Sequence, residues 1–183
     1  ILVGEIRDSE TAQIALQAAL TGHLVFTTVH ANRSFEVINR LLHMGIKPYN
    51  LVSALNCIAA QRLIRTLCDC KSKTTISERK LLQSGLNPKK YKHHVFYEAK
   101  GCEDCKGTGY KGRKAIMELI EFDDALREMF IQRAPFSILK KKAASSGTTF
   151  LRKSAINEVL TGKTTLREIN RVTFIEPTEM KQA

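Results

Sequence analysis

The chain has 183 residues, a length that favours one compact domain with a smaller appendage. Leu, Ile, Val and Phe supply 50 of them, well above the share found in disordered chains, so a sizeable core can form. No apolar stretch reaches the roughly 20 residues of a membrane-spanning helix and no charged-then-apolar leader is visible, so neither a membrane-spanning class nor a secretion signal is predicted. The chain opens on Ile1 without a methionine, which predicts a piece of a longer protein.

The net charge of +11 is concentrated in the middle of the chain. Residues 63–114 carry a net charge of +8, against +1 for residues 1–62 and +2 for residues 115–183. Such a basic segment suits the phosphates of nucleotides, nucleic acid or acidic lipids, and charge alone does not choose among them. Five cysteines favour a metal site plus one buried thiol over a disulfide framework, and hence a reducing compartment.

The first thirty residues predict a strand, a helix and a second strand. The apolar residues 1–3 indicate a strand buried on both faces, and residues 23–29 indicate another. Between them, Asp8 or Ser9 caps a helix that runs to Leu20 and stops at Gly22. A crossover of this kind makes the two strands parallel, so Glu5 and His30 are expected at the same sheet edge, where ligands of open α/β sheets bind.

The remaining elements are predicted from apolar spacing and caps. Ser34 caps a helix ending at Gly45, and a further helix covers 51–67, with Cys57 packed on it. A basic, cysteine-rich appendage follows over 68–114, with a helix near 77–83 and strands at 95–98 and 115–120. About three short helices complete the chain, with caps at Asp123, Thr148 and Thr165, the last forming a capping box with Glu168.

Glu5 and His30 are the candidate catalytic residues. An acid at the end of a buried strand can serve the Mg²⁺ shell or the attacking water of a nucleotide hydrolase, and an imidazole beside it can hydrogen-bond a terminal phosphate. The alternative for each is structural: a strand-ending acid that caps the next helix, and a histidine satisfied within the fold. Asp8 is more simply the helix cap than a catalyst.

Four of the cysteines form a candidate metal site. Cys102 and Cys105 have the C-x₂-C spacing, and Cys68 and Cys70 precede them by about thirty residues. Two chelating pairs can close a tetrahedral thiolate site, for which Zn²⁺ is the natural occupant. The first pair is one residue shorter than usual. The alternative is four reduced surface thiols.

Several segments together resemble one family. Leu2 to Asp8 is similar to a Walker B segment, and the run from Thr21-Gly22-His23 to His30-Ala31-Asn32 is similar to a histidine box. The resemblance continues through 101–105, 108–113, Leu151 and 160–165. The chain thus resembles the ATPases of type II secretion and type IV pilus assembly, the GspE/PilB family of the secretion ATPase superfamily.

The resemblance implies a fold and a site. The fold would be α/β: a partial RecA-like P-loop NTPase core over 1–67, a zinc-binding tetracysteine insertion over 68–114, and a strand with a C-terminal helical bundle over 115–183. Gly4, Glu5 and His30 would bind the nucleotide, with Glu5 polarising water or supporting Mg²⁺ and His30 facing the phosphate. The implied cofactors are ATP, Mg²⁺ and Zn²⁺. The chain has no GxxxxGK[ST] loop, which the family carries upstream of its Walker B strand.

The same resemblance implies partners. It predicts the C-terminal part of a hexameric ATPase, cytoplasmic and peripheral to the inner membrane, that contacts platform and adaptor proteins and an acidic lipid surface but no nucleic acid. Arg40 and Arg62 are candidates to face a nucleotide across a subunit boundary. Two alternatives remain open: a basic zinc-ribbon module that binds nucleic acid, and a scaffold fragment without activity of its own.

Overall fold

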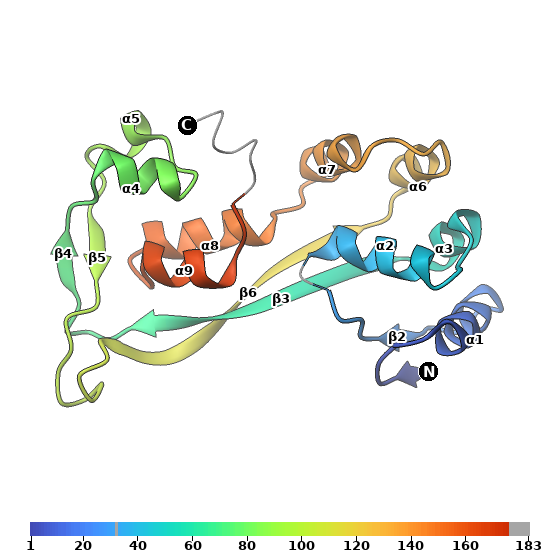
Figure 1. Ribbon diagram of the computed structural model, residues 1–183, viewed down its shortest axis with the longest axis horizontal. Helices are drawn as coiled ribbons and strands as arrows, with labels where there is room; N and C mark the ends of the chain where they lie inside the picture. The colour runs from blue at the N-terminus through green and yellow to red at the C-terminus, as the bar shows by residue number, and fades with distance from the viewer. Residues whose placement is uncertain (32, 176–183) are drawn as a thin grey trace. The chain divides into compact units, whose positions relative to one another are not determined.

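The computed structural model describes residues 1–31 and 33–175, and it divides into two compact units (Figure 1). Unit 1 consists of residues 1–60 and 118–149, and unit 2 of residues 61–117 and 150 onward. Two long strands, β3 (Cys57–Leu67) and β6 (Tyr110–Glu121), contribute residues to both units. The expected domain limits after residues 67 and 114 stay a prediction. Within the described residues, no helix combines the length and the apolar character needed to cross a membrane.

Unit 1 begins with a strand, a helix and a second strand, as predicted. The elements are β1 (Leu2–Val3), α1 (Ser9–Leu20) and β2 (Phe26–Thr27). The two strands pair in parallel, Leu2 beside Phe26, which confirms the crossover. Asp8 caps the helix because its carboxylate accepts the Thr11 N–H at 2.8 Å. The chain leaves α1 through Gly22, whose φ of +97° favours glycine.

The expected burial of these strands is wrong for the described part of the chain. Leu2 is 81% exposed and Phe26 is 61% exposed, although a parallel strand is normally covered on both faces. The second strand is also shorter than the predicted 23–29. An apolar run can predict that a strand forms, but its burial depends on which other segments pack over the strand. Within the described residues, nothing covers the side chains of Leu2 and Phe26 fully, so they stay in contact with solvent.

Four further helices build the core of unit 1: α2 (Ser34–His43), α3 (Pro48–Ala54), α6 (Asp124–Ile131) and α7 (Phe136–Ser145). Their apolar faces bury Ile38, Val52 and Leu126 almost completely. Phe35 of α2 meets Phe136 of α7 edge to face, with ring centroids 5.8 Å apart. The helix predicted to end at Gly45 is confirmed, but Ser34 does not cap it: the N-cap is Arg33, and Ser34 is the buried first residue.

The helix predicted over 51–67 is wrong. It ends at Ala54, and the chain then runs as β3, which pairs with β6. The Phe122 N–H donates to the Asn56 carbonyl and the Cys68 N–H to the Gly109 carbonyl, so the two strands are antiparallel. The strand forms because its hydrogen-bond partners lie more than 40 residues further along the chain, beyond the reach of local apolar spacing. Cys57, predicted as packed on a helix, is an exposed residue of β3.

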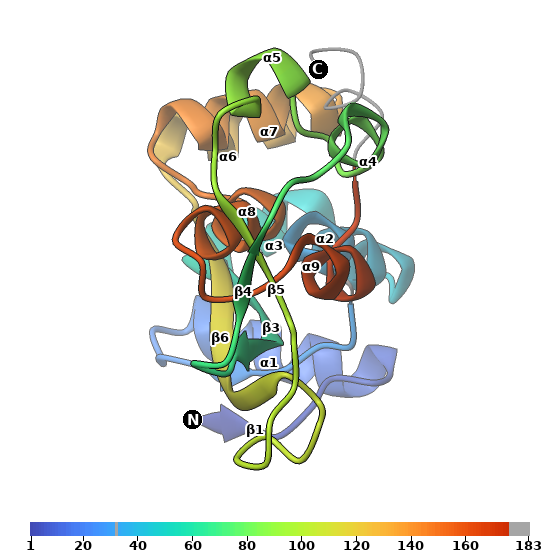
Figure 2. The same cartoon turned by 90° about the vertical axis from the view of Figure 1, so that its left-hand side faces the viewer.

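Unit 2 joins a small antiparallel ladder to short helices. The ladder consists of β4 (Ser72–Thr74) and β5 (Phe96–Glu98), which run side by side (Figure 2). The helices are α4 (Glu78–Gln83), α5 (Pro88–Tyr91), α8 (Leu151–Leu160) and α9 (Leu166–Val172). Ile64, Phe96 and Ile169 lie in its core. The predicted helix near 77–83 and the strand at 95–98 are confirmed.

The caps of the last helices are only partly as predicted. Asp123 caps α6 by accepting the Leu126 N–H at 2.7 Å. Thr148 is not a cap, because its hydroxyl donates to the Leu119 carbonyl and Phe150 precedes α8. Thr165 caps α9, but only half of the capping box forms, since the Glu168 carboxylate binds two arginines instead. Among the residues described, four helices follow β6 rather than about three, because residues 124–145 form two helices, α6 and α7, with a break between them where Arg133 has a φ of +58°.

Candidate functional site

Glu5 and His30 lie at the same edge of the β1–β2 pair, as the strand order predicts. Glu5 follows β1 and His30 follows β2, so both leave the carboxyl ends of parallel strands. Glu5 Oε1 is 3.4 Å from His30 Nε2. The histidine side chain is 82% exposed, whereas that of Glu5 is 18% exposed. An acid and an imidazole therefore converge on one open edge, where a polar ligand can reach both.

The two oxygens of Glu5 have different surroundings. Oε2 accepts a hydrogen bond from Arg7 Nε at 2.6 Å, while Oε1 has no hydrogen-bond partner among the described residues. The hydrogen bond from Arg7 holds the pKa of Glu5 below its ordinary value, with a smaller electrostatic contribution from His30 and Arg40. The carboxylate is thus ionised at neutral pH, and one of its oxygens remains available to accept a proton or contact a cation.

Arg7 is a contact that the sequence analysis missed. In extended backbone, residues i and i+2 point to the same side, so an arginine two positions after Glu5 is placed to reach it. The alternation Glu5-Ile6-Arg7, in which the buried Ile6 separates two charged side chains of opposite sign, is the signal that could have indicated this pair.

The backbone beside His30 is held from α2. Arg40 Nη1 donates to the His30 carbonyl at 2.8 Å, which places this candidate arginine near the site. Arg62, the other candidate, lies on β3 rather than on a helix. Gly4 has open space where a side chain would begin, and its carbonyl accepts the Thr28 hydroxyl at 2.7 Å. Asn32, which closes the segment similar to a histidine box, lies outside the described residues.

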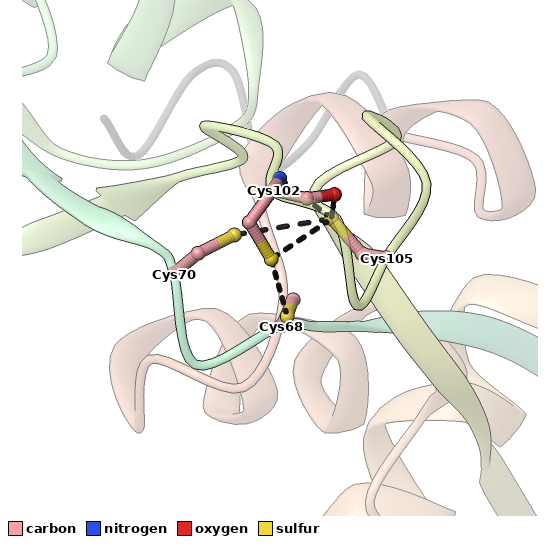
Figure 3. A group of neighbouring side chains, drawn as sticks. All are labelled: Cys68, Cys70, Cys102 and Cys105. Carbon is pink, nitrogen blue, oxygen red and sulfur yellow. Dashed lines mark hydrogen bonds between the residues drawn. The ribbon is translucent and has the colours of Figure 1, made fainter.

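The four cysteines 68, 70, 102 and 105 form a second constellation, in unit 2. Cys68 and Cys70 lie just after β3, before β4, and Cys102 and Cys105 lie on the loop before β6 (Figure 3). Their four sulfur atoms lie within 4.8 Å of one another. The Sγ–Sγ distances are 3.8 Å for Cys68–Cys102, 3.9 Å for Cys70–Cys105 and 3.7 Å for Cys102–Cys105.

These distances fit a tetrahedral thiolate site. With Zn–S bonds of about 2.3 Å, tetrahedral geometry places sulfur atoms about 3.8 Å apart. The shorter spacing of Cys68 and Cys70 still brings Cys70 to its partner at 3.9 Å. All four thiols are reduced, and two of them are buried. The alternative of four reduced thiols on the surface therefore fits this cluster poorly.

Backbone N–H groups favour a thiolate at Cys105. Burial would raise the pKa of this thiol, but the N–H groups of Cys102 and Gly109, each 3.1 Å from its Sγ, lower the pKa to about 6. At Cys70, desolvation raises the pKa of the thiol to about 12. A cluster that already favours one thiolate suits a divalent cation, which stabilises the deprotonated form of every ligand.

Comparisons with known proteins agree with the resemblance. The family model for "Type II/IV secretion system protein" matches residues 1–171. The chain is 44% identical over 171 residues to the type IV pilus assembly ATPase PilB of Myxococcus xanthus, covering 92% of this chain and 30% of that protein. It is also 44% identical over 174 residues to the type II secretion system protein E of Aeromonas hydrophila, covering 94% and 34%. The chain thus spans about a third of the length of these relatives.

Solved structures show the same fold. The crystal structure of the pilus retraction motor PilT with bound ADP superposes with a TM-score of 0.66 at 21% identity, covering 100% of this chain and 41% of that one. The X-ray structure of the Legionella pneumophila ATPase DotB gives a TM-score of 0.62 at 21% identity, covering 94% and 37%.

Proposed function

The chain belongs to the type II/IV secretion system protein family, and from this membership we propose that it is the C-terminal portion of an ATPase motor. In that motor, ATP hydrolysis drives either type II secretion or type IV pilus assembly. The observation that carries the proposal is the approach of Glu5 to His30 at 3.4 Å, at the edge of a parallel strand pair in a chain 44% identical to named ATPases.

Each residue of the site has a defined role in the proposed reaction. Glu5 polarises the attacking water through Oε1, which has no hydrogen-bond partner among the described residues, while Arg7 holds Oε2 and keeps the carboxylate ionised. His30 donates a hydrogen bond to the terminal phosphate. Bound Mg²⁺ would be held near Glu5 and would neutralise charge on the phosphates. The open space beside Gly4 lets a nucleotide approach the backbone.

The proposal extends to the core, the metal and the assembly. Residues 1–67 form part of a RecA-like P-loop core, and the rest of that core lies in a part of the protein outside this chain. The length of the relatives, which is about three times that of this chain, supports this assignment. The tetracysteine cluster holds structural Zn²⁺. The motor is a hexamer that works beside the inner membrane on platform and adaptor proteins, with the basic segment 63–114 toward acidic lipid.

The nucleic-acid alternative has less support. Base stacking needs free aromatic faces near the basic segment. Phe96 is 2% exposed. Lys71 Nζ lies over the Tyr97 ring at 4.8 Å from its centroid, and the Arg65 guanidinium lies over Tyr110 at 4.2 Å. These rings are occupied, so base stacking on them is not expected. Observing steeply salt-dependent binding to DNA or RNA would favour the alternative.

The decisive experiment measures Mg-ATP hydrolysis by the full-length protein. We expect Glu5→Gln to lower kcat at least about 100-fold, because the neutral amide no longer accepts a proton from water. Glu10→Gln makes the same chemical change at an exposed acid of α1 and is expected to leave kcat unchanged. Full activity of Glu5→Gln would refute the assignment. The isolated 183 residues are expected to show no turnover.

A further inference from the structure

A buried carboxylate from β6 caps the helix that follows the candidate histidine. Glu118 is 6% exposed, and its Oε1 accepts the Ser34 N–H at 2.9 Å and the Ser34 hydroxyl at 2.6 Å. Ser34 is fully buried and is the first residue of α2. Figure 1 shows α2 beside the end of β6 that leads into α6. The two residues are 84 positions apart, so this contact joins distant parts of unit 1.

This contact replaces the usual local cap of the helix. The first N–H groups of a helix lack partners within it, and a side chain just before the helix normally accepts from them. Here the N-cap residue, Arg33, makes no such bond, and Glu118 accepts from the first turn instead. A carboxylate at this end is also favoured by the helix dipole. Glu118 therefore fixes where α2 starts.

The start of α2 lies close to His30 along the chain. Only three residues separate His30 from Ser34, and the His30 carbonyl is itself held by Arg40 of α2 at 2.8 Å. The imidazole is 82% exposed, so packing does little to hold the ring. Its distance of 3.4 Å from Glu5 thus depends on the backbone on both sides of the ring. On the β2 side, the Ile6 N–H donates to the Thr28 carbonyl at 2.9 Å, and on the α2 side Arg40 and the start of the helix hold the chain.

We propose that Glu118 is a positioning residue for ATP hydrolysis: by anchoring Ser34 at the start of α2, it holds His30 opposite Glu5. The inference rests on the function proposed above. Because placement of reacting groups affects turnover more than nucleotide affinity, the expected signature is a loss in kcat with little change in KM.

The test uses the full-length protein with the variants Glu118→Ala, Glu118→Gln, Ser34→Ala and the control Glu121→Gln. Glu121 lies three residues further along β6 and is exposed, so the control makes the same change on the same strand without the contact. Turnover is expressed per nucleotide-binding site, and the number of sites is measured by nucleotide titration. A misfolded fraction of the protein then does not lower the apparent kcat. Hydrogen exchange of the amides at the start of α2 reports the anchor directly.

We expect Glu118→Ala to lower kcat about tenfold or more and to change KM for ATP less than about threefold. Glu118→Gln keeps an acceptor oxygen and should recover part of the loss. Exchange at residues 34–38 should accelerate in Glu118→Ala but not in Glu121→Gln. Adding Ser34→Ala to Glu118→Ala should cost little more, because the Ser34 hydroxyl has already lost its hydrogen bond to Glu118.

The failure of this inference differs from the failure of the proposed function. A wild-type protein that hydrolyses no ATP, or an active Glu5→Gln variant, refutes the function. If wild type is active and Glu5→Gln is not, then a Glu118→Ala variant that matches Glu121→Gln, or that changes only KM, overturns the role of Glu118. Should Glu118→Ala fail to fold, the Glu118→Gln and Ser34→Ala variants decide: unchanged kcat and exchange in both overturn it.

Discussion

The strongest electrostatic prediction concerns Glu168, a fully buried carboxylate of α9. Arg65 donates to it from Nη2 at 2.6 Å and from Nε at 3.0 Å, and Arg171 Nη2 donates at 2.8 Å. Burial alone would raise the pKa of Glu168, but the hydrogen bonds from these two arginines lower it to about 2. The perturbation is Glu168→Gln, which keeps the size of the side chain and removes its charge.

The size of the effect follows from the shift in pKa. The ordinary value for Glu is 4.5, so the pKa in the folded chain is lower by between two and three units. At about 1.4 kcal/mol for each unit, ionised Glu168 contributes about 3 kcal/mol to the free energy of unfolding at neutral pH. This agrees with the 3–5 kcal/mol lost, in order of magnitude, when one partner of a buried ion pair is removed.

The pH dependence has a definite sign. Because the folded pKa lies below the unfolded one, the contribution is complete above about pH 4.5 and is lost as the pH falls toward 2. Urea unfolding followed by circular dichroism should therefore give a difference of about 3 kcal/mol between wild type and Glu168→Gln at pH 7. That difference should shrink steadily below pH 4.5. The control Glu121→Gln, at an exposed position, should change the free energy of unfolding at pH 7 by less than about 0.5 kcal/mol. A difference that stays constant down to pH 2.5 would refute the reasoning.

Three further predictions concern the two sites. Metal analysis of reduced protein should find about one Zn²⁺ per chain, lost in Cys102→Ser but kept in the exposed Cys57→Ser; absence of zinc in wild type would contradict the tetracysteine site. His30→Ala in the full-length protein should slow ATP turnover more than it weakens nucleotide binding, and unchanged turnover would exclude this histidine. Gly109→Ala should release zinc more readily, because the new Cβ would lie 2.5 Å from Ala99 Cβ and would displace the backbone whose N–H donates to Cys105 Sγ. Gly22→Ala, at a similar positive φ but in open space, should retain zinc like wild type.

Local signals predicted the elements whose partners are close along the chain. The cap at Asp8, the apolar spacing of α1 and the short crossover are all contained within thirty residues, so the parallel pair and the approach of Glu5 to His30 follow from them. The C-x₂-C pair likewise indicates a thiolate site from its spacing alone. The partnership with Cys68 and Cys70 also requires the intervening segment, with β4, α4, α5 and β5, to bring its two ends together.

Elements that depend on distant partners were predicted only in part: the strand expected over 115–120 is confirmed within β6, but its partner β3 was predicted as a helix. Residues 57–67 have apolar spacing compatible with a helix, yet Ile58 and Ile64 are buried on a strand because β6 supplies its hydrogen bonds. β6 also brings Glu118 to Ser34, the serine that was predicted to cap α2 by itself. In both cases the local pattern indicated which side chains are buried or hydrogen-bonded, but not the segment they contact.

The distinction bears on how the proposed motor site is built. Its reacting groups, Glu5 and His30, come from a short continuous segment, whereas the contacts that fix His30 come from Arg40 of α2 and, through Ser34, from Glu118 of β6. Glu118 lies on a strand that pairs with β3, and a residue on a paired strand is held more precisely than one on a loop. The exposed imidazole can therefore stay oriented without being buried, and so remains accessible to a phosphate.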